Sequence, residues 1–392
     1  MARAPLDFGK LRLETRLAHA GRDRARSEGA VNPPVHRATT LLIDDPDDLY
    51  GGPKKTYGID GMAVQQALRE ALVAIEGGVS ATLTPSGLAA CTLALMTVAK
   101  AGGELLVTDA LYAPTRRFCE TTLKRFGVKT RYIDPRSGAG IADLITDETC
   151  GVFLESPGTH TFEVMDVPAI AAAARARNLP VVLDNTWSAG VYFKPFEHGV
   201  DISVQALTKY QSGHADAFVG AVLAGTSAWA ERVNATNRQL GLFASPDDCY
   251  LLLRGLRTLG VRLERQSASA LSIAQWLEAR PEIARVIHPA LPSHPDHAIW
   301  NRDFSGASGV FSCQVEPAAP ERLKAMLEGF SIFAMGFSWG GYESLIVPSG
   351  KDIRRVVAKP SGEGTLLRLS IGLEHPDDLI ADLEAGLARL RG

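Results

Sequence analysis

The sequence predicts an α/β protein, in which a large domain with a mostly parallel sheet is followed by a smaller α+β domain. From about residue 61 to residue 240, short apolar runs alternate with segments of helical periodicity, which is typical of parallel strands joined by helices. Near residues 251–259 this pattern changes, and the strands become sparser. The chain has 392 residues, more than one hydrophobic core usually serves. We therefore expect an N-terminal arm over residues 1–60, a large domain over 61–256 and a C-terminal domain over 257–392.

The expected elements follow one another along the chain. Apolar residues from Val64 to Ile75 recur at helical spacing, and Glu76-Gly-Gly78 ends that helix. Strands are expected at 104–108, 129–134, 152–155, 181–184, 202–207 and 218–223, with helices at 114–126, 167–177 and 228–240. The C-terminal part should contain helices over 261–279 and 377–390 and strands at 284–288, 310–315 and 366–371. The proline-rich segment 30–40 predicts an extended arm that contacts another surface, such as a second subunit.

The composition argues against several classes of protein. Acidic and basic residues are mixed along the chain and give a net charge of -3, which is not typical of nucleic-acid binding. The first ten residues lack the apolar core of a signal peptide, and no apolar run reaches the length of a membrane span. The five cysteines are scattered without a CxxC pair, so we expect neither a disulfide framework nor a metal site. We expect a cytoplasmic protein without membrane or nucleic-acid partners.

Polar residues follow the expected strands, and ligands of open parallel sheets bind at these carboxyl ends. Lys209 follows the run 202–207, and Asp184 ends the run 181–184. A buried lysine is costly unless its charge is lost or used, and one use is a Schiff base with an aldehyde cofactor. Taken alone, Lys209 is better explained as a lysine whose amine extends to water than as a Schiff-base lysine. Asp184 alone is explained equally well as a helix cap.

Two other features suit a phosphate and a planar ring. Ser86-Gly87-Leu88 stands between a short strand and a helix, where Gly87 allows close backbone approach and the helix amino end favours an anion. Ordinary capping by Ser86 explains the same residues. Thr208 offers a hydroxyl to the same phosphate, and Tyr112 can either stack on a ring or pack in the core.

Together these residues indicate more than any one of them. A lysine for an aldehyde, an aspartate for a ring nitrogen, an aromatic side chain for a ring face and hydroxyls with a helix amino end for a phosphate meet the requirements of pyridoxal 5′-phosphate. All of them lie at the ends of expected strands. We therefore expect a pyridoxal-phosphate site along this edge of the sheet.

A series of motifs runs in one order along the chain. They are Val31-Asn-Pro-Pro-Val-His-Arg-Ala38, Tyr57-Gly58, Leu154-Glu-Ser-Pro157, Leu183-Asp-Asn-Thr-Trp187, Gln205-Ala-Leu-Thr-Lys-Tyr210, Gly213-His-Ala-Asp216, Arg254-Gly-Leu-Arg-Thr-Leu259, Ser338-Trp-Gly-Gly-Tyr-Glu-Ser344 and Leu367-Arg-Leu-Ser-Ile-Gly-Leu-Glu374. With them the sequence resembles the pyridoxal-phosphate enzymes of cysteine and methionine metabolism, the transsulfuration family, along nearly its whole length. Within that family, the motif that begins Ser338-Trp339 is most similar to the bacterial cystathionine β-lyases.

The resemblance implies a fold, an assembly and a set of roles. The fold is the aspartate-aminotransferase type, or fold type I, in a homotetramer that is a dimer of dimers with shared active sites. The implied catalytic and cofactor-binding residues are Lys209 as the covalent anchor and proton carrier, Asp184 at the ring nitrogen, Tyr112 on the ring, and Gly87, Leu88, Thr208 and the neighbouring subunit's Tyr57 at the phosphate. The implied substrate-binding residues are Arg368 at the α-carboxylate, with Ser338, Trp339, Asn185 and Tyr57 around it. The implied reaction is α,β-elimination of L-cystathionine to homocysteine, pyruvate and ammonia in methionine biosynthesis.

The sequence departs from the family pattern after Tyr57-Gly58. The family commonly has two arginines there, and this chain has Ile59 and Asp60. Arg117 stands where the lyases tend to have an acid, so we hypothesise that Asp60 and Arg117 form a swapped ion pair. Other activities therefore stay open: a cystathionine γ-lyase, a γ-synthase, a methionine γ-lyase-like enzyme, a β-lyase for another cysteine S-conjugate, or a cofactor-binding protein without turnover.

Overall fold

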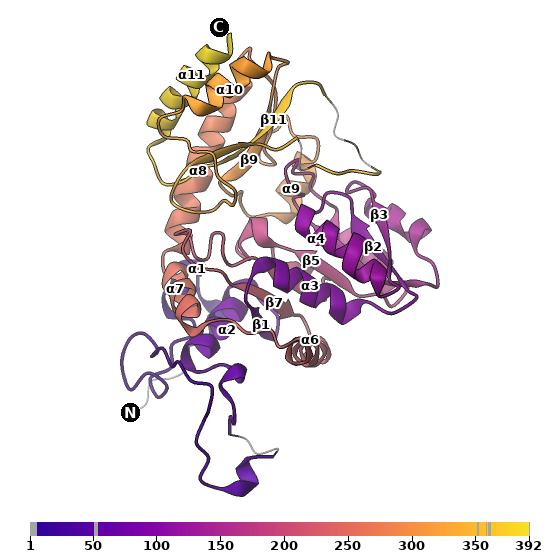
Figure 1. Ribbon diagram of the computed structural model, residues 1–392, viewed down its shortest axis with the longest axis vertical. Helices are drawn as coiled ribbons and strands as arrows, with labels where there is room; N and C mark the ends of the chain where they lie inside the picture. The colour runs from indigo at the N-terminus through magenta and orange to yellow at the C-terminus, as the bar shows by residue number, and fades with distance from the viewer. Residues whose placement is uncertain (1–5, 51–53, 351–352, 358, 360–361, 392) are drawn as a thin grey trace.

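A seven-stranded sheet forms the centre of the larger domain (Figure 1), in the strand order β1-β7-β6-β5-β4-β2-β3. The computed structural model describes residues 6–50, 54–350, 353–357, 359 and 362–391. The strands are β1 (Ser80–Thr84), β2 (Glu104–Thr108), β3 (Lys129–Ile133), β4 (Thr149–Glu155), β5 (Val181–Asp184), β6 (Ile202–Gln205) and β7 (Gly220–Ala224). Strands β3, β2, β4, β5 and β6 are parallel, whereas β7 is antiparallel to both β6 and β1. The predicted mostly parallel sheet is confirmed.

Helices cover both faces of this sheet, because successive side chains of its strands point to opposite sides and both sides are apolar. Val182 packs into the core formed with α3 (Gly87–Val98) and α6 (Ser227–Leu240). Leu183 packs into the core on the other face with α5 (Val167–Arg175), and α2 (Ala63–Glu76) and α7 (Pro246–Leu256) cover the neighbouring strands on their own side. The carboxyl ends of the parallel strands are left at one edge, where the loops that follow them gather.

The smaller domain holds a four-stranded antiparallel sheet in the order β10-β11-β9-β8. Its strands are β8 (Ile283–Ile287), β9 (Val310–Val315), β10 (Leu345–Pro348) and β11 (Thr365–Ser370). Helices α8 (Leu259–Glu278), α10 (Pro320–Glu328) and α11 (Pro376–Arg391) pack on it, and α9 (His297–Asp303) lies beside the larger domain. The three strands predicted here are confirmed, while β10 was not predicted.

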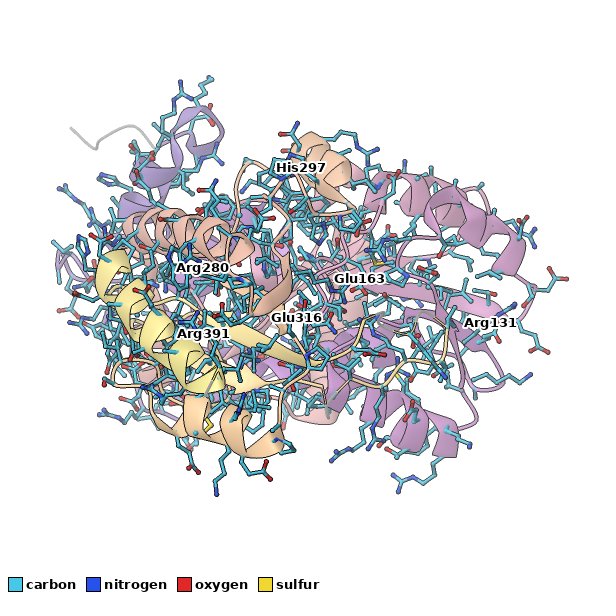
Figure 2. All side chains as sticks on the ribbon, turned by 90° about the horizontal axis from the view of Figure 1, so that it is seen from above. Arg131, Glu163, Arg280, His297, Glu316 and Arg391 are labelled. Carbon is cyan, nitrogen blue, oxygen red and sulfur yellow. The ribbon has the colours of Figure 1, made fainter. Side chains whose placement is uncertain are left out.

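The segment between β10 and β11 reaches back to the larger domain. The amides of Val356 and Val357 donate to Asp109 Oδ2 at 2.9 and 2.8 Å, and Arg355 Nη2 lies 3.3 Å from a carboxylate oxygen of Glu163. Figure 2 shows Glu163 where the two domains meet. Since Asp109 directly follows β2, this segment ties the smaller domain to the strand ends.

Several sequence predictions need correction in detail. The helix predicted over 114–126 is α4 (Ala113–Phe118) continued by a π-helical turn (Cys119–Leu123). The strand predicted over 202–207 ends at Gln205, so the next residues form a turn. The helix α7 was not predicted, because the change of pattern at 251–259 was interpreted as a domain boundary. Short 3₁₀ helices occupy Phe8–Lys10, Pro46–Asp48, Gly58–Asp60, Gly138–Leu144, Thr186–Ser188 and Pro195–His198.

The N-terminal segment has two parts. Helix α1 (Leu13–His19) packs on its own chain, with Leu17 only 2% exposed. The described residues from about 30 to 50 and from 54 to 57 belong to the indigo arm that projects from the body in Figure 1, and a bridge joins Thr40 and Tyr57. Residues 1–5 and 51–53 of the predicted arm lie outside the described residues.

Candidate active site

Lys209 lies in the turn after β6 and contacts the smaller domain. Its Nζ donates a hydrogen bond to Ser338 Oγ at 2.9 Å and lies 5.1 Å from the ring centroid of Trp339. Burial, and after it the Arg368 guanidinium, lower the pKa of the Lys209 amine to about 8, while Asp184 acts in the opposite direction. An amine with this pKa has a sizeable neutral fraction at neutral pH, so it can act as a nucleophile or a base.

Asp184 ends β5 and uses both of its carboxylate oxygens. Oδ1 accepts from the amide of Thr186 at 3.0 Å and from the Thr186 hydroxyl at 2.5 Å, and Oδ2 accepts from Cys91 Sγ at 3.5 Å. Burial raises the pKa of Asp184, whereas the bonds from Thr186 and Cys91 and the charge of Lys209 lower it. These contacts fix the carboxylate near the Lys209 amine, in a position where it can bind a protonated ring nitrogen.

The amino end of α3 supplies a place for an anion. The hydroxyl of Ser86 accepts from the third amide of the helix at 3.1 Å, whereas the first two amides, those of Gly87 and Leu88, have no partner within a helix. A Cβ on Gly87 would lie 2.4 Å from Ala206 Cβ. The glycine therefore allows the helix end to approach the turn that carries Thr208 and Lys209, and helix amino ends bind phosphate.

Arg368 and Ser338 bring the smaller domain into the site. Arg368 lies on β11, is 8% exposed, and donates from Nη2 to the backbone oxygen of Ser338 at 2.8 Å. Ser338 has a φ of 80°, which is uncommon for a residue other than glycine. This backbone conformation is held because the oxygen of Ser338 binds Arg368 while its hydroxyl binds Lys209.

Tyr112 stands at the amino end of α4 on the larger domain. Its side chain is exposed, at 41%, and its amide donates to Glu155 Oε2 at 2.7 Å. Burial raises the pKa of the Tyr112 hydroxyl, and the nearby Cys91, Glu155 and Asp184 raise it further. The tyrosine is thus in electrostatic range of the residues around Asp184.

Two of the predicted site residues lie apart from this group. Asn185 is fully buried, donates from Nδ2 to Glu76 Oε1 at 2.9 Å, and accepts at Oδ1 from the Ser188 hydroxyl at 2.6 Å. Its side chain therefore stabilises the turn after β5, and its hydrogen-bond partners are not among the other predicted site residues. Tyr57 is 51% exposed and belongs to the projecting arm.

Within this chain Asp60 pairs with an arginine other than Arg117. The hypothesised pair of Asp60 and Arg117 stays a prediction, because the loop that carries Asp60 is expected to act at a neighbouring subunit. Asp60 Oδ1 accepts from Arg238 Nη2 at 3.1 Å. Arg238 lies on α6, and the backbone oxygen of Asp60 also accepts from Arg69 at 3.0 Å. Sequence spacing gave no sign of either partner, since both contacts depend on how α2 and α6 pack against the segment around Asp60.

Three functional neighbours were not assigned from the sequence. Cys91 was counted only among the scattered cysteines, and Glu155 and Thr186 occurred only within the motifs Leu154-Glu-Ser-Pro157 and Leu183-Asp-Asn-Thr-Trp187. The position of Thr186 was a usable signal, because an aspartate commonly accepts from the residue two positions later. Cys91 and Glu155 carry no such local signal, since their contacts depend on the packing of α3 and α4.

We also searched the rest of the described chain for ligand cavities, metal sites and membrane-spanning helices. A cavity of about 380 Å³ is lined by residues that include Arg136, Glu163 and His294 but by none of the predicted site residues. The described residues contain no group of three or more His, Cys, Asp or Glu side chains suited to a metal ion. Among the helices of the described part, none is long and apolar enough to cross a membrane.

The fold and the site define a class of protein. An amine of lowered pKa, a carboxylate fixed beside it and a helix amino end at the same sheet edge are the donor set for a cofactor that carries an aldehyde, a ring nitrogen and a phosphate. The residues present therefore fit pyridoxal phosphate, and the protein is a pyridoxal-phosphate enzyme of fold type I.

Comparison with known proteins gives the family. The chain belongs to the Cys/Met metabolism PLP-dependent enzymes, whose sequence model matches residues 14–388. It is 43% identical to the cystathionine β-lyase of Salmonella typhimurium, over 96% of this chain and 98% of that protein. It is 41% identical to cystathionine β-lyase MetC of Escherichia coli, over 97% and 99%. The crystal structure of a cystathionine γ-synthase of Xanthomonas oryzae superposes with a TM-score of 0.90 at 31% identity, over 97% and 99%.

Proposed function

We propose that this enzyme is a carbon–sulfur lyase that cleaves L-cystathionine by α,β-elimination. Cystathionine and water would give homocysteine, pyruvate and ammonia, a step of methionine biosynthesis. The observation that carries the proposal is the higher identity, 43% and 41%, to two full-length relatives named cystathionine β-lyase, against 31% to the γ-synthase structure. The small sulfur amino acid as substrate class follows from the family, and the particular substrate is our inference.

The residues that would hold the cofactor come from the larger domain. Bound pyridoxal phosphate supplies an aldehyde for the amine and a ring that takes up the electrons of the bond being broken. We assign Asp184 to the ring nitrogen, the Tyr112 ring to the ring face, and the amides of Gly87 and Leu88 with the Thr208 hydroxyl to the phosphate. The donors that fix Asp184 support the first assignment, because an ionised carboxylate favours a protonated ring nitrogen.

The substrate would lie between Lys209 and the smaller domain. The guanidinium of Arg368 suits the α-carboxylate, because its planar fork can donate two parallel hydrogen bonds. Lys209 Nζ would remove the α-proton, and its lowered pKa supports this task. Ser338 Oγ holds that amine at 2.9 Å. As the β-carbon–sulfur bond breaks, its electron pair leaves with sulfur, which takes up a proton.

We propose that the enzyme works as a homotetramer in the cytoplasm, with Tyr57 reaching the phosphate of a neighbouring subunit. The arm that carries Tyr57 exposes large apolar side chains to solvent in the single chain, among them Leu42 at 93% and Tyr50 at 91%. Exposed apolar surface of this kind is typical of protein interfaces. All five cysteines are free and buried, which suits a reducing compartment.

A product assay tests the proposal. The purified holoenzyme is incubated with cystathionine, cysteine, methionine, homoserine esters and other cysteine S-conjugates, and keto acid and thiol are measured together. A β-lyase forms pyruvate and homocysteine from cystathionine in equal amounts. Formation of 2-oxobutyrate and cysteine would instead identify γ-elimination, and absence of product from every substrate would identify a protein without turnover. Lys209→Ala is the matched control for background hydrolysis.

A further inference from the structure

Glu155 is a buried carboxyl group at the site that the proposed reaction does not use. It ends β4, and its register partner on the adjacent strand is Asp184, so that the two carboxyl groups stand at neighbouring strand ends. Glu155 is 9% exposed. Burying a second carboxyl group beside Asp184 costs folding free energy that an apolar residue would not cost. Its presence therefore suggests that Glu155 has a role of its own.

Both oxygens of Glu155 are engaged by the loops beside it. Oε2 accepts from the amide of Tyr112 at 2.7 Å, and Oε1 forms a short hydrogen bond with the Thr159 hydroxyl. The loop that follows β4 is also fixed to the loop that follows β2, because the Thr159 amide donates to the oxygen of Ala110 at 2.9 Å. A Cβ on Gly158 would lie only 2.4 Å from Ala110 Cβ. Glu155 thus lies at the point where two loops of the site are fastened together.

The position of the Tyr112 ring depends on the hydrogen bond between Glu155 and the Tyr112 amide. Tyr112 is the N-cap of α4, a helix of only six residues, and the residue is 41% exposed, so that packing holds its side chain only in part. A partly packed side chain depends on its own backbone for its position. The backbone of Tyr112 is held at its amide by the Glu155 carboxyl group.

We propose that Glu155 is a positioning residue, which fixes the Tyr112 backbone and thereby holds the Tyr112 ring over the cofactor ring. The inference rests on the proposed role of Tyr112 in stacking. It does not depend on which sulfur amino acid is the substrate.

The charge state of Glu155 agrees with this role. Burial, and next the charge of Asp184, raise the pKa of Glu155 to about 8, although the bonds from Thr159 and Tyr112 and the charge of Arg355 act in the opposite direction. A raised pKa means that Glu155 takes up a proton more readily than an exposed glutamate, and a protonated Glu155 would no longer oppose a negative charge on Asp184. A neutral glutamine of the same shape should replace Glu155 in this task.

Cofactor binding in the absence of substrate tests the proposal. Glu155→Ala should weaken binding of pyridoxal phosphate to the apoenzyme by about tenfold, as expected for one buried hydrogen bond, and change the visible circular dichroism of the bound cofactor. Glu155→Gln should restore both properties to within about threefold of wild type. Tyr112→Ala should give the same dichroism change, and adding Glu155→Ala to it should produce no further change, because the two residues act through one ring.

Controls separate this role from a general loss of stability. Glu282→Ala removes another buried glutamate, 6% exposed and paired with Arg391 on the smaller domain, and should lower the melting temperature without affecting cofactor binding. If Glu155→Ala does not fold, Thr159→Val removes the other partner of the carboxyl group and should weaken cofactor binding in the same direction by a smaller factor.

Two results would overturn the proposal. One is an unchanged cofactor affinity and spectrum in folded Glu155→Ala, or in Thr159→Val where the alanine variant does not fold. The other is an additive effect of Glu155→Ala and Tyr112→Ala, since additivity means that Glu155 acts by a separate route. Because every readout is taken without substrate, a failure of the assigned β-lyase activity would leave these measurements intact.

Discussion

At the scale of single residues, the Lys209 amine, the Arg368 guanidinium and the Asp184 carboxylate share one buried neighbourhood. Removing each charge from water costs several kcal/mol. Burial is the largest influence on the pKa of Lys209 and lowers it; Arg368 lowers it further by disfavouring the ammonium form, and Asp184 acts in the opposite direction. An arrangement that destabilises a lysine charge in this way is typical of catalytic sites.

The lowered pKa of Lys209 leads to a prediction about apoenzyme reconstitution. Only the neutral amine attacks the cofactor aldehyde, so the rate of pyridoxal phosphate capture should rise about tenfold per pH unit up to about pH 8 and then level off. With an ordinary lysine the capture rate would continue to rise with pH up to the usual pKa of lysine, above 10. Stopped-flow absorbance between pH 7 and 10 measures the profile. Arg368→Leu should move the plateau to higher pH, because a positive charge that disfavours the ammonium form is gone, and Lys209→Ala should show no covalent capture.

A second residue-scale prediction concerns Thr186, which donates twice to Asp184. Thr186→Val removes the hydroxyl donor at 2.5 Å. Since a hydrogen bond to a charged group contributes about 1.5–3 kcal/mol, cofactor affinity and kcat/KM should fall about 10- to 100-fold. Thr186→Ser keeps the hydroxyl and is the matched control, expected within about threefold of wild type. Equal behaviour of the two variants would show that the hydroxyl does not hold the carboxylate.

At the scale of elements, the approach of α3 to the turn after β6 determines where the phosphate and the lysine can meet. Gly87 and Ala206 face each other with no room for another methyl group. Gly87→Ala should therefore push the amino end of α3 from the turn, cost about 1–3 kcal/mol in stability, and weaken cofactor binding about tenfold or more. Thermal unfolding and absorbance titration measure the two effects.

Two variants sharpen this test of the helix position. Ala206→Gly added to Gly87→Ala removes the opposing methyl group, so it should restore part of the cofactor affinity. Gly140→Ala is the matched control, because a Cβ there meets nothing within 4 Å. A Gly87→Ala protein with normal affinity, or a double variant no better than the single one, would contradict the proposed close approach.

The element scale also shows what the sequence could and could not predict. Strands β2, β5 and β9 were predicted at their observed bounds, because a buried strand is a short apolar run with clear polar ends. Asp184 could be found because it ends such a run, and Lys209 because it closely follows one. The partners Cys91, Glu155 and Arg238 could not, because each contact joins elements whose relative placement depends on tertiary packing.

At the scale of the whole molecule, the site lies between two sheets. The larger domain supplies Lys209, Asp184 and Tyr112, and the smaller one supplies Arg368 and Ser338. We propose that the two domains divide near residue 256, where α7 ends and α8 leads into the smaller sheet. The segment around Arg355 contacts both domains and resists movement between them. Because Lys209 and Arg368 lie on different domains, such movement would change the distance between them and with it the fit of a substrate.

The proposed sharing of active sites between subunits gives the last prediction. If Tyr57 serves the neighbouring chain, Lys209→Ala and Tyr57→Ala each damage every site of their own homodimers. When the two variants are unfolded and refolded together, about half of the dimers should contain one chain of each variant. Each mixed dimer has one intact site of its two, so about a quarter of wild-type activity should return. Turnover before and after mixing measures this recovery, with light scattering to verify that both variants assemble. Activity that stays at the average of the separate variants, in mixtures shown to exchange subunits, would place Tyr57 in the site of its own chain and remove the reason for a shared site.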